Sequence, residues 1–476
     1  MKYRTEKDSL GEFNVPAEAL HGINTSRSLG NFPVSGFTLP SRQVAAIAII
    51  KQACAMANME LGLLEKKKGA AIVKAAAKVA SGGHGDQFPV DIFSSGSGTS
   101  HNMNVNEVIA NLAEEALGGR RGEKKLVHPN DHVNMGQSTN DVFPSSIKVA
   151  AAPCVAELAG RTRGLVATLK RKSRQFDKII KSGRTHLQDA VPVRMGQVFG
   201  AWAYSISKGE ERLRCVMPRF MELAVGGNAV GTGINNHPRF RKLVIKHLNI
   251  IIKDAGAFKG VGAFKGAGAF KVAGHDIEAV HNTNDMAALS AAVSSLAVDV
   301  QRICNDLRLM ASGPMTGFNE VNLPPVEPGS SIMPGKVNPS ICEAVNMVCL
   351  KVFGNHQTIF MAAQSAQLEL NVTMPVTGYA LLESLTILAN GVMILDEKCV
   401  AGVTVNREVC ERYALRSPSL ATFLNPHIGY ARASEVAKKA VREGKTVPEV
   451  VLEEGLMSKA ELAKVFDPKK LTSPEG

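Results

Sequence analysis

The feature that most constrains the fold is an apolar seam between residues 286 and 310. Its apolar residues recur at alternating intervals of three and four, the spacing of one helix face. They are Met286, Leu289, Val293, Leu296, Val300, Ile303, Leu307 and Met310. A helix with this seam is about 40 Å long and needs partner helices of comparable length. A second seam from Ile341 to Ala362, which contains the polar Asn355, and a helix predicted over 381–396 can supply them.

The rest of the chain is also predominantly helical in composition. Residues 1–40 predict irregular structure with a short hairpin. At 401–406 the long helical segments give way to shorter ones. Further helices are predicted over 41–80 with breaks near Gly62 and Gly69, and over 105–116, 142–175, 196–223, 433–443, 447–454 and 458–465. We therefore expect a mostly α protein with three domains. These are an N-terminal mixed helical and loop domain (1–137), a central long-helix bundle (138–397) and a small C-terminal helical domain (398–476).

Composition narrows the class of protein. The 476 residues are 45% hydrophobic and 21% charged, an ordinary globular balance. Residues 1–8 carry five charges with no apolar run after them, and no segment approaches roughly 18 uninterrupted apolar residues. The eight cysteines are scattered, mostly among apolar neighbours, which is typical of free buried thiols in a reducing cytosol. We expect a soluble cytoplasmic protein without a membrane partner.

The net charge of +12 does not by itself identify a partner. The basic residues are dispersed, and one Trp with five Tyr offers little surface for stacking single-stranded nucleic acid. We therefore expect no nucleic-acid partner. A binding protein of that class would lose affinity steeply with salt.

The segment from Glu327 to Pro339 holds two glycines, three prolines, two serines, a lysine and an asparagine without helical or strand periodicity. It is predicted to be a loop between long helices. Lys336 and Asn338, two residues apart, can grip an anion, and the glycines allow the loop to close.

Three other polar segments lie over 94–102, 128–141 and 182–189. Hydroxyls next to a helix start suit an anion, although an ordinary N-cap has the same composition. His128 and His132 are four residues apart, but Pro129 argues against a helix that presents both to a metal. The glycines of 226–233 lack the order of a dinucleotide-binding loop and predict a tight turn. No metal and no cofactor is predicted.

A short repeat, Gly-Ala-Phe-Lys, occurs at 256–259, 262–265 and 268–271. Three such copies are too short to be units of a solenoid, so we expect an excursion on the surface.

Gly-Ser-Ser-Ile-Met-Pro-Gly-Lys-Val-Asn-Pro at 329–339 resembles the signature of the fumarase/aspartase superfamily. Segments 96–104, 128–141, 183–189 and 425–430 match in the same order and extend the resemblance over nearly the whole chain. It implies a mostly α three-domain subunit with a central long-helix bundle, and a homotetramer whose active sites combine loops of three subunits. The implied reaction is anti addition to fumarate, or its reverse, through an aci-carboxylate intermediate and without a cofactor.

The resemblance also implies roles for individual residues. Ser330 would be the base, Lys336 and Asn338 would bind a carboxylate, and His186 would pair with Glu343 to orient water. Neutral hydrogen bonds to the dicarboxylate substrate would come from Ser97, Thr99, Ser138, Thr139, Asn140 and Thr185. A second anion site would comprise His128, Asn130 and Asp131. Because a serine is a poor base in water, Ser330 needs neighbouring amides or cations to lower its pKa.

The loops disagree about the leaving group. Segments 96–99, 128–131, 342–344 and 425–430 resemble class II fumarate hydratases of the tricarboxylic acid cycle, whereas 86–88, 138–140, 305–310 and 367–372 resemble aspartate ammonia-lyases. One methyl group, at Thr139, is worth only about 1–3 kcal/mol of discrimination. Val198 and Asn228 depart from both patterns, which usually have Glu and Thr there. Hydration of fumarate is the expected reaction, deamination of aspartate is the alternative, and a structural role, as in the related delta-crystallins, is a third hypothesis.

Overall fold

The computed structural model describes residues 2–254 and 269–473, which are mostly helical. The chain forms two compact units. Unit 1 comprises residues 1–160, 209–297 and 349–389, and unit 2 comprises 161–208, 298–348 and 390–476. The predicted mostly α fold class is confirmed.

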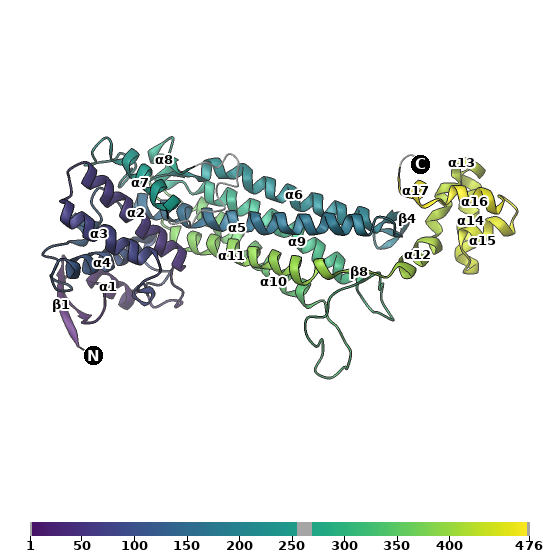
Figure 1. Ribbon diagram of the computed structural model, residues 1–476, viewed down its shortest axis with the longest axis horizontal. Coiled ribbons are helices and arrows are strands. Elements are labelled where there is room, and N and C mark those ends of the chain that lie inside the picture. Colours follow the sequence, from purple (N-terminus) through teal and green to yellow (C-terminus); the bar gives the residue numbers. More distant parts are fainter. Residues whose placement is uncertain (1, 255–268, 474–476) are drawn as a thin grey trace. The chain divides into compact units, whose positions relative to one another are not determined.

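Unit 1 begins with an antiparallel hairpin of β1 (Tyr3–Asp8) and β2 (Gly11–Pro16), as predicted. Helices then pack together, α2 against α3 and α7, and α3 against α4 (Figure 1). The predicted break near Gly62 is confirmed, since Gly62 has a positive φ after α2. The two helices predicted over 41–80 are α2 and α3, but no break occurs at Gly69 itself, which lies inside α3 close to the Met59 side chain. The bounds are α1 (Ile23–Asn31), α2 (Ser41–Glu60), α3 (Lys66–Ala80), α4 (Thr99–Ala116) and α7 (Phe240–Asp254).

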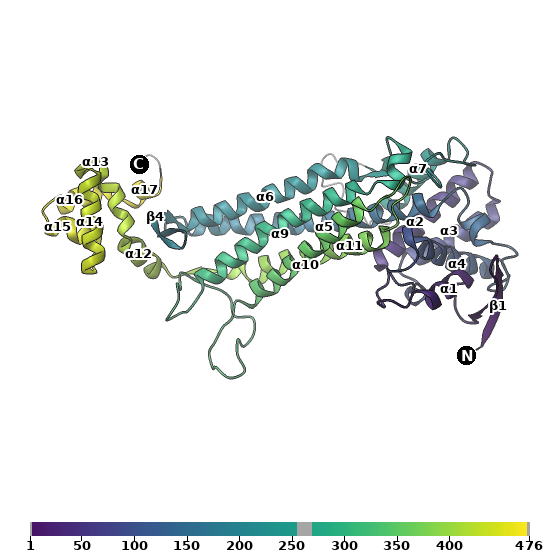
Figure 2. The same ribbon diagram turned by 180° about the vertical axis from the view of Figure 1, so that it is seen from behind.

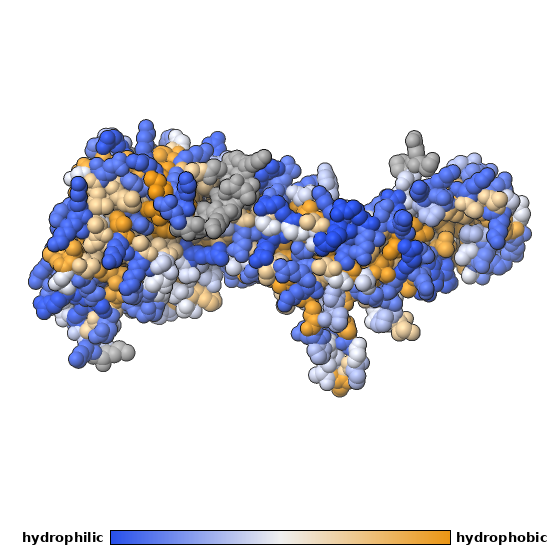
Figure 3. Space-filling view, viewed as in Figure 1, coloured by the Kyte–Doolittle hydropathy of each residue, from blue (hydrophilic) through white to orange (hydrophobic). Residues whose placement is uncertain are grey.

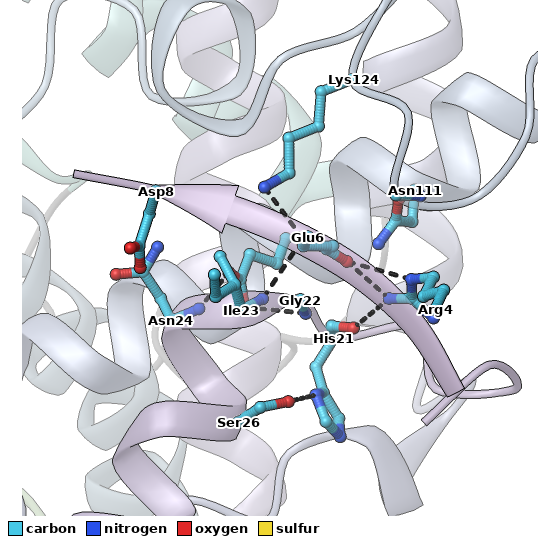
Figure 4. A network of polar contacts seen from close by, with 12 residues as sticks. Arg4, Glu6, Asp8, His21, Gly22, Ile23, Asn24, Ser26, Asn111 and Lys124 are labelled. Atoms are coloured by element: carbon cyan, nitrogen blue, oxygen red, sulfur yellow. Dashed lines mark hydrogen bonds and ion pairs between the residues drawn. The ribbon is translucent and has the colours of Figure 1, made fainter. Parts of the chain in front are cut away.

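A buried ionic network holds the hairpin against α1 (Figure 4). Glu6 accepts a hydrogen bond from Arg4 Nε at 3.0 Å and pairs with Lys124 Nζ at 2.9 Å, and Arg4 also donates to the His21 carbonyl at 2.7 Å. The first amides of α1 have no cap on their own segment. Glu107 of α4 accepts hydrogen bonds from the N–H groups of 22, 24 and 25 instead. A carboxylate at this end also complements the helix dipole.

The predicted long helices are present. All eight residues of the first seam are at most 8% exposed. Asn355 in the second seam is buried, and its amide donates to Ser384 Oγ at 3.0 Å and to Glu383 Oε2 at 2.8 Å, which satisfies it there. The helices are α5 (Thr139–Gln175), α6 (Met195–Phe220), α9 (Asn284–Met310), α10 (Ser340–Gln364) and α11 (Met374–Lys398).

Three of these stretches have the length and mean hydropathy of a membrane-crossing helix: α5, α9 and 374–402. The most apolar window of α5 is 89% buried within the chain, and that of α9 is 50% buried. Part of the α9 surface therefore remains apolar and uncovered by this one chain.

Unit 2 contains the hairpin of β3 (Ile180–Thr185) and β4 (Gln188–Arg194), where the sequence predicted only a polar segment. Its C-terminal helices include α12 (Arg407–Arg416), α14 (Tyr430–Glu443), α15 (Val447–Glu453) and α16 (Lys459–Val465), and α14 packs against α15 (Figure 2). The last three confirm the predicted C-terminal helices. Residues of α14, α15, α16 and the 418–424 turn share one apolar core.

Several helices were not predicted from apolar spacing, or begin earlier than predicted. Helices α1, α7, α12 and α8 (Asp276–His281) were not predicted, and α4 and α11 begin six and seven residues before the predicted starts of 105 and 381. All eight cysteines are free, and seven are buried as expected, but Cys215 is exposed.

The first two Gly-Ala-Phe-Lys copies lie outside the described residues. The described end of the third copy does not fit a surface excursion. Phe270 is 3% exposed and exchanges hydrogen bonds with the Asn249 side chain. Lys271 and Val272 form β6, which pairs in parallel with β5 (Glu222–Leu223).

Candidate active site

Ser97 and Thr99 lie at the start of α4, in the first of the predicted polar segments. The Ser97 amide donates to the Val372 carbonyl at 3.0 Å, and its hydroxyl lies 3.5 Å from that of Thr99. Gly98 between them has a φ of +95°, and a Cβ there would meet the Phe143 ring. Only glycine allows both the backbone conformation and this close approach.

Ser138, Thr139 and Asn140 form the start of α5. Asp141, which is 0% exposed, accepts the Ser138 amide at 3.0 Å and the amides of Gly226 and Asn228 at 2.8 Å each. Burial raises the pKa of Asp141 to about 6. The carboxyl group therefore ties the start of α5 to the glycine-rich turn.

The turn over 226–233 is the predicted tight turn. Gly226, Gly231 and Gly233 have positive φ values, and so does Asn228. Asparagine tolerates this conformation better than the threonine usual in the superfamily, which explains how the departure at 228 is accommodated. The turn also receives the Asn140 side chain, which donates to the Ala229 carbonyl at 2.8 Å.

Buried amides bring the starts of α4 and α5 together. Asn102 Nδ2 lies 3.1 Å from Thr139 Oγ1 and 3.3 Å from Asn134 Oδ1. Asn106 Nδ2 and Lys51 Nζ also donate to that Asn134 oxygen, at 3.2 and 2.7 Å. Sequence reasoning did not identify this support. The sequence features that could have indicated it are two asparagines one helical turn apart in α4 and a lysine within the apolar helix α2.

The predicted second anion site is a single π-helical turn (Pro129–Val133), not the expected loop. His128 caps it, since its Nδ1 accepts the amides of Asn130 and Asp131 at 3.3 Å each and lies 3.3 Å from the Asp131 carboxylate. Pro129 fits because the first helical residue needs no N–H donor. Glu114 accepts the amides of 125–127 and so fixes the approach to His128.

His132 is not arranged with His128 as a metal-ligand pair. Its Nδ1 accepts the His128 backbone amide at 2.8 Å. Within 2–254 and 269–473, no group of three His, Cys, Asp or Glu residues could hold a metal ion.

In unit 2, Thr185 and His186 lie at the tip of the β3–β4 hairpin. His186 and Leu187 both have positive φ, which is the conformation of a two-residue hairpin turn. The Thr185 and His186 side chains are exposed. The base of the hairpin is rigid, since the fully buried Glu320 pairs with Lys181 at 3.3 Å and with Arg184 at 2.9 Å.

The 327–339 loop is mostly exposed and hydrogen-bonded to itself. The Gly329 amide donates to the Lys336 carbonyl at 2.9 Å, and Asn338 Nδ2 donates to the Gly329 carbonyl at 2.7 Å. Ser330 Oγ accepts the amides of Ile332 and Met333 at 3.2 and 3.0 Å. These donors favour a negatively charged oxygen.

The same loop borders an open hollow of 380 Å³ that Ser330 and Lys336 help to line. Ile332 is 84% exposed, and Figure 3 shows apolar atoms on the projecting loop. The loop therefore brings Ser330 and Lys336 to one hollow while its apolar side chains remain uncovered in the single chain.

Glu343 lies in the first turn of α10, and its Oε1 is 3.9 Å from Arg308 Nη2. Among the described hydrogen bonds, none joins Glu343 to His186. The expected pairing is thus not formed within one chain, and a pairing between chains stays a prediction.

The predicted site residues are divided between the two units. Unit 1 contains Ser97, Thr99, Ser138, Thr139 and Asn140 with the second anion site His128, Asn130 and Asp131. Unit 2 contains Thr185, His186, Ser330, Lys336, Asn338 and Glu343. Unit 1 supplies uncharged donors and the second anion site, and unit 2 supplies a cation, a carboxylate, a histidine and the candidate base.

Most of the chain matches the models of known protein families. Residues 11–354 match the model of a lyase family, and 420–473 match that of the fumarase C C-terminus. A class II fumarate hydratase of Halobacterium salinarum is 47% identical over 471 residues, which are 99% of this chain and 97% of the relative. An aspartate ammonia-lyase of Bacillus subtilis is 40% identical over 99% of this chain and 97% of the relative. The crystal structure of a class II fumarase from Schistosoma mansoni has a TM-score of 0.94 at 38% identity, covering both chains completely.

Proposed function

The chain belongs to the fumarase/aspartase superfamily of lyases, and from this premise we propose that it is a class II fumarate hydratase, which interconverts fumarate and L-malate. Full-length relatives with that name are 43–47% identical. The substrate is a small dicarboxylate, and the reaction is an anti addition or elimination of water.

The identity to those hydratases carries the choice of reaction, and the observation that supports its chemistry is the pair of amides at Ser330. Removal of a proton from the carbon beside a carboxylate requires a base. The N–H groups of Ile332 and Met333 point at Ser330 Oγ and stabilise it as an alkoxide, which an exposed serine in water does not form. Lys336, on the same hollow, neutralises charge on the aci-carboxylate that develops.

The remaining roles divide between the two units. Asn338 assists Lys336 in carboxylate binding, and His186 with Glu343 orients the water that adds or leaves. The donors of unit 1 and Thr185 bind the substrate oxygens, namely Ser97, Thr99, Ser138, Thr139 and Asn140. His128, Asn130 and Asp131 form the second anion site.

The site is completed by other copies of the chain in a homotetramer. Large apolar side chains on the surface of α10 support this assembly, since Met347, Leu350, Phe360 and Met361 are 54–65% exposed. A homotetramer would cover them and the apolar part of α9, and would bring His186 of one chain to Glu343 of another. Each subunit would have the three domains 1–137, 138–397 and 398–476, and the enzyme would be cytoplasmic and part of the tricarboxylic acid cycle.

Aspartate ammonia-lyase is the alternative function. It is favoured by Thr139 after Ser138 and by the full-length Bacillus subtilis relative. Both reactions use Ser330, Lys336 and Asn338, so only the leaving group separates them.

The test is an absorbance assay of fumarate with purified protein in a buffer that contains a chelator. Conversion of fumarate and malate, with aspartate inert, supports the hydratase. Release of ammonia from L-aspartate, with malate inert, selects the ammonia-lyase. No change with any of the three would refute an enzymatic function of this class.

A further inference from the structure

Lys51 is a lysine enclosed in unit 1 that the proposed mechanism does not use. It is 0% exposed, and none of the described carboxylates forms an ion pair with it. Burial lowers the pKa of Lys51 to about 7, and the nearby Cys54 thiol and Asp141 carboxyl oppose that shift. Its Nζ donates to Asn134 Oδ1 at 2.7 Å, and an amine can donate in either protonation state.

Asn134 is the acceptor on which three donors converge. Besides Lys51 Nζ, its Oδ1 accepts Asn106 Nδ2 at 3.2 Å and Asn102 Nδ2 at 3.3 Å. Donors on one side fix the amide orientation, so Asn134 Nδ2 faces the Gln137 carbonyl at 3.0 Å. Lys51 makes the shortest of these contacts and thereby anchors the segment that leads into Ser138.

Asn102 carries this orientation to the predicted substrate-binding residue. Because its Nδ2 faces Asn134 Oδ1, the same amide group donates to Thr139 Oγ1 at 3.1 Å. The Thr139 hydroxyl is then an acceptor toward the interior, and its own hydrogen is left for another acceptor. None of the described hydrogen bonds uses Thr139 as that donor. A substrate carboxylate is the acceptor that the proposed function supplies.

We propose that Lys51 is a positioning residue, which, through Asn134 and Asn102, turns the Thr139 hydroxyl to donate to a substrate carboxylate. This inference rests on the proposed function and adds the buried group that sets the polarity of the carboxylate site. Asp141 holds the same segment from the other side, because its carboxyl group accepts a hydrogen bond from the Ser138 amide. The start of α5 is thus fixed both in position and in the direction of its donors.

A double-mutant cycle distinguishes this role from a general contribution to folding. Lys51→Met keeps the length of the side chain and removes the donor, and Thr139→Val removes the hydroxyl. We expect each single change to lower kcat/KM roughly tenfold to a hundredfold, mainly through a higher KM. Since both changes break one relay, the double variant should be no worse than the poorer single variant within about threefold.

The matched control is Lys148, a second buried lysine of unit 1, whose Nζ donates to the Glu222 carbonyl at 3.0 Å and to Asp285 at 2.7 Å. Lys148→Met should lower the melting temperature, and its effect on kcat/KM should multiply with that of Thr139→Val. If the effects of Lys51→Met and Thr139→Val multiply in the same way, Lys51 is only structural and the inference is wrong.

If Lys51→Met does not fold, Lys51→Leu takes its place in the cycle, because leucine is smaller and also has no donor. Fumarate binding to the wild-type protein, measured by calorimetry, distinguishes a failure of the proposed function from a failure of this inference alone. A wild-type protein that neither binds fumarate nor converts malate or aspartate overturns the proposed function together with the inference. An active wild-type protein without coupling in the cycle overturns the inference alone.

Discussion

The start of α5 and the 327–339 loop carry two halves of the candidate chemistry and are held in opposite ways. Around Thr139, the hydrogen bonds come from buried side chains of α2 and α4 and from backbone amides of the 226–233 turn. Around Ser330, the hydrogen bonds come from the loop itself and the side chains are largely exposed.

This difference separates two demands of the proposed reaction. Carboxylate binding gains from donors that are already oriented, because no reorganisation is then needed when the substrate arrives. The base must admit substrate and afterwards exclude water, which suits a loop that can move over its ligand. Substitutions in the two regions should accordingly separate activity from stability.

The largest expected effect is on turnover, in the loop. Ser330→Ala should lower kcat by roughly 10³-fold or more, because it removes the proposed base. The melting temperature should not change, since among the described residues the Ser330 hydroxyl bonds to neighbouring amides of the exposed loop alone. Ser331→Ala is the matched control and should be close to wild type in the fumarate absorbance assay. Near-wild-type activity of Ser330→Ala would show that another group is the base.

The next effect is a pH-dependent stability in the rigid region. Burial raises the pKa of Asp141 from 3.8 to about 6, so the native state favours the neutral acid. Its contribution is fully present below about pH 3.8 and is lost as the pH rises through about 6, which changes the free energy of unfolding by about 3 kcal/mol. Urea unfolding of wild type and Asp141→Asn at pH 4 and pH 7 measures this change. A difference between the two proteins that is the same at both pH values would contradict it.

Glycine substitutions sharpen the same comparison at a smaller scale. Gly98→Ala should destabilise the protein by about 1–3 kcal/mol, because the new methyl group meets the Phe143 ring and φ is +95°. Gly335→Ala in the exposed loop should cost only about 1 kcal/mol, since φ is +75° but no atom of the described residues lies within 4 Å of the new Cβ. Chemical denaturation of both variants tests this order, and equal costs would show that the ring contact is relieved elsewhere.

The smallest expected effect is that of Ile332→Ala, below about 0.5 kcal/mol, because this side chain is 84% exposed. Its contrast is Ile147→Ala in α5, where a 0% exposed side chain should cost about 2–5 kcal/mol. Equilibrium unfolding measures both. A loss above about 1 kcal/mol for Ile332→Ala would mean that another subunit covers the loop.

Much of the molecule was predictable from local pattern. The seam from Met286 to Met310 predicted a long buried helix because apolar spacing of three and four leaves few alternatives. The glycines, prolines and polar groups of 327–339 predicted a loop for equally local reasons. Short helices such as α8 were missed because so few residues give no measurable period.

The sequence by itself determined the mostly α architecture, the 327–339 loop and the superfamily, because helical period and the signature motif are properties of consecutive residues. Only the tertiary structure decided that a chain of hydrogen bonds joins Thr139 to Asn102, Asn134 and Lys51. It also decided that Glu320 forms an ion pair with Arg184 of the hairpin that ends at His186. These contacts join residues that are far apart in the chain. Hydrogen-bond direction depends on distance and orientation in space, which no spacing along the sequence records.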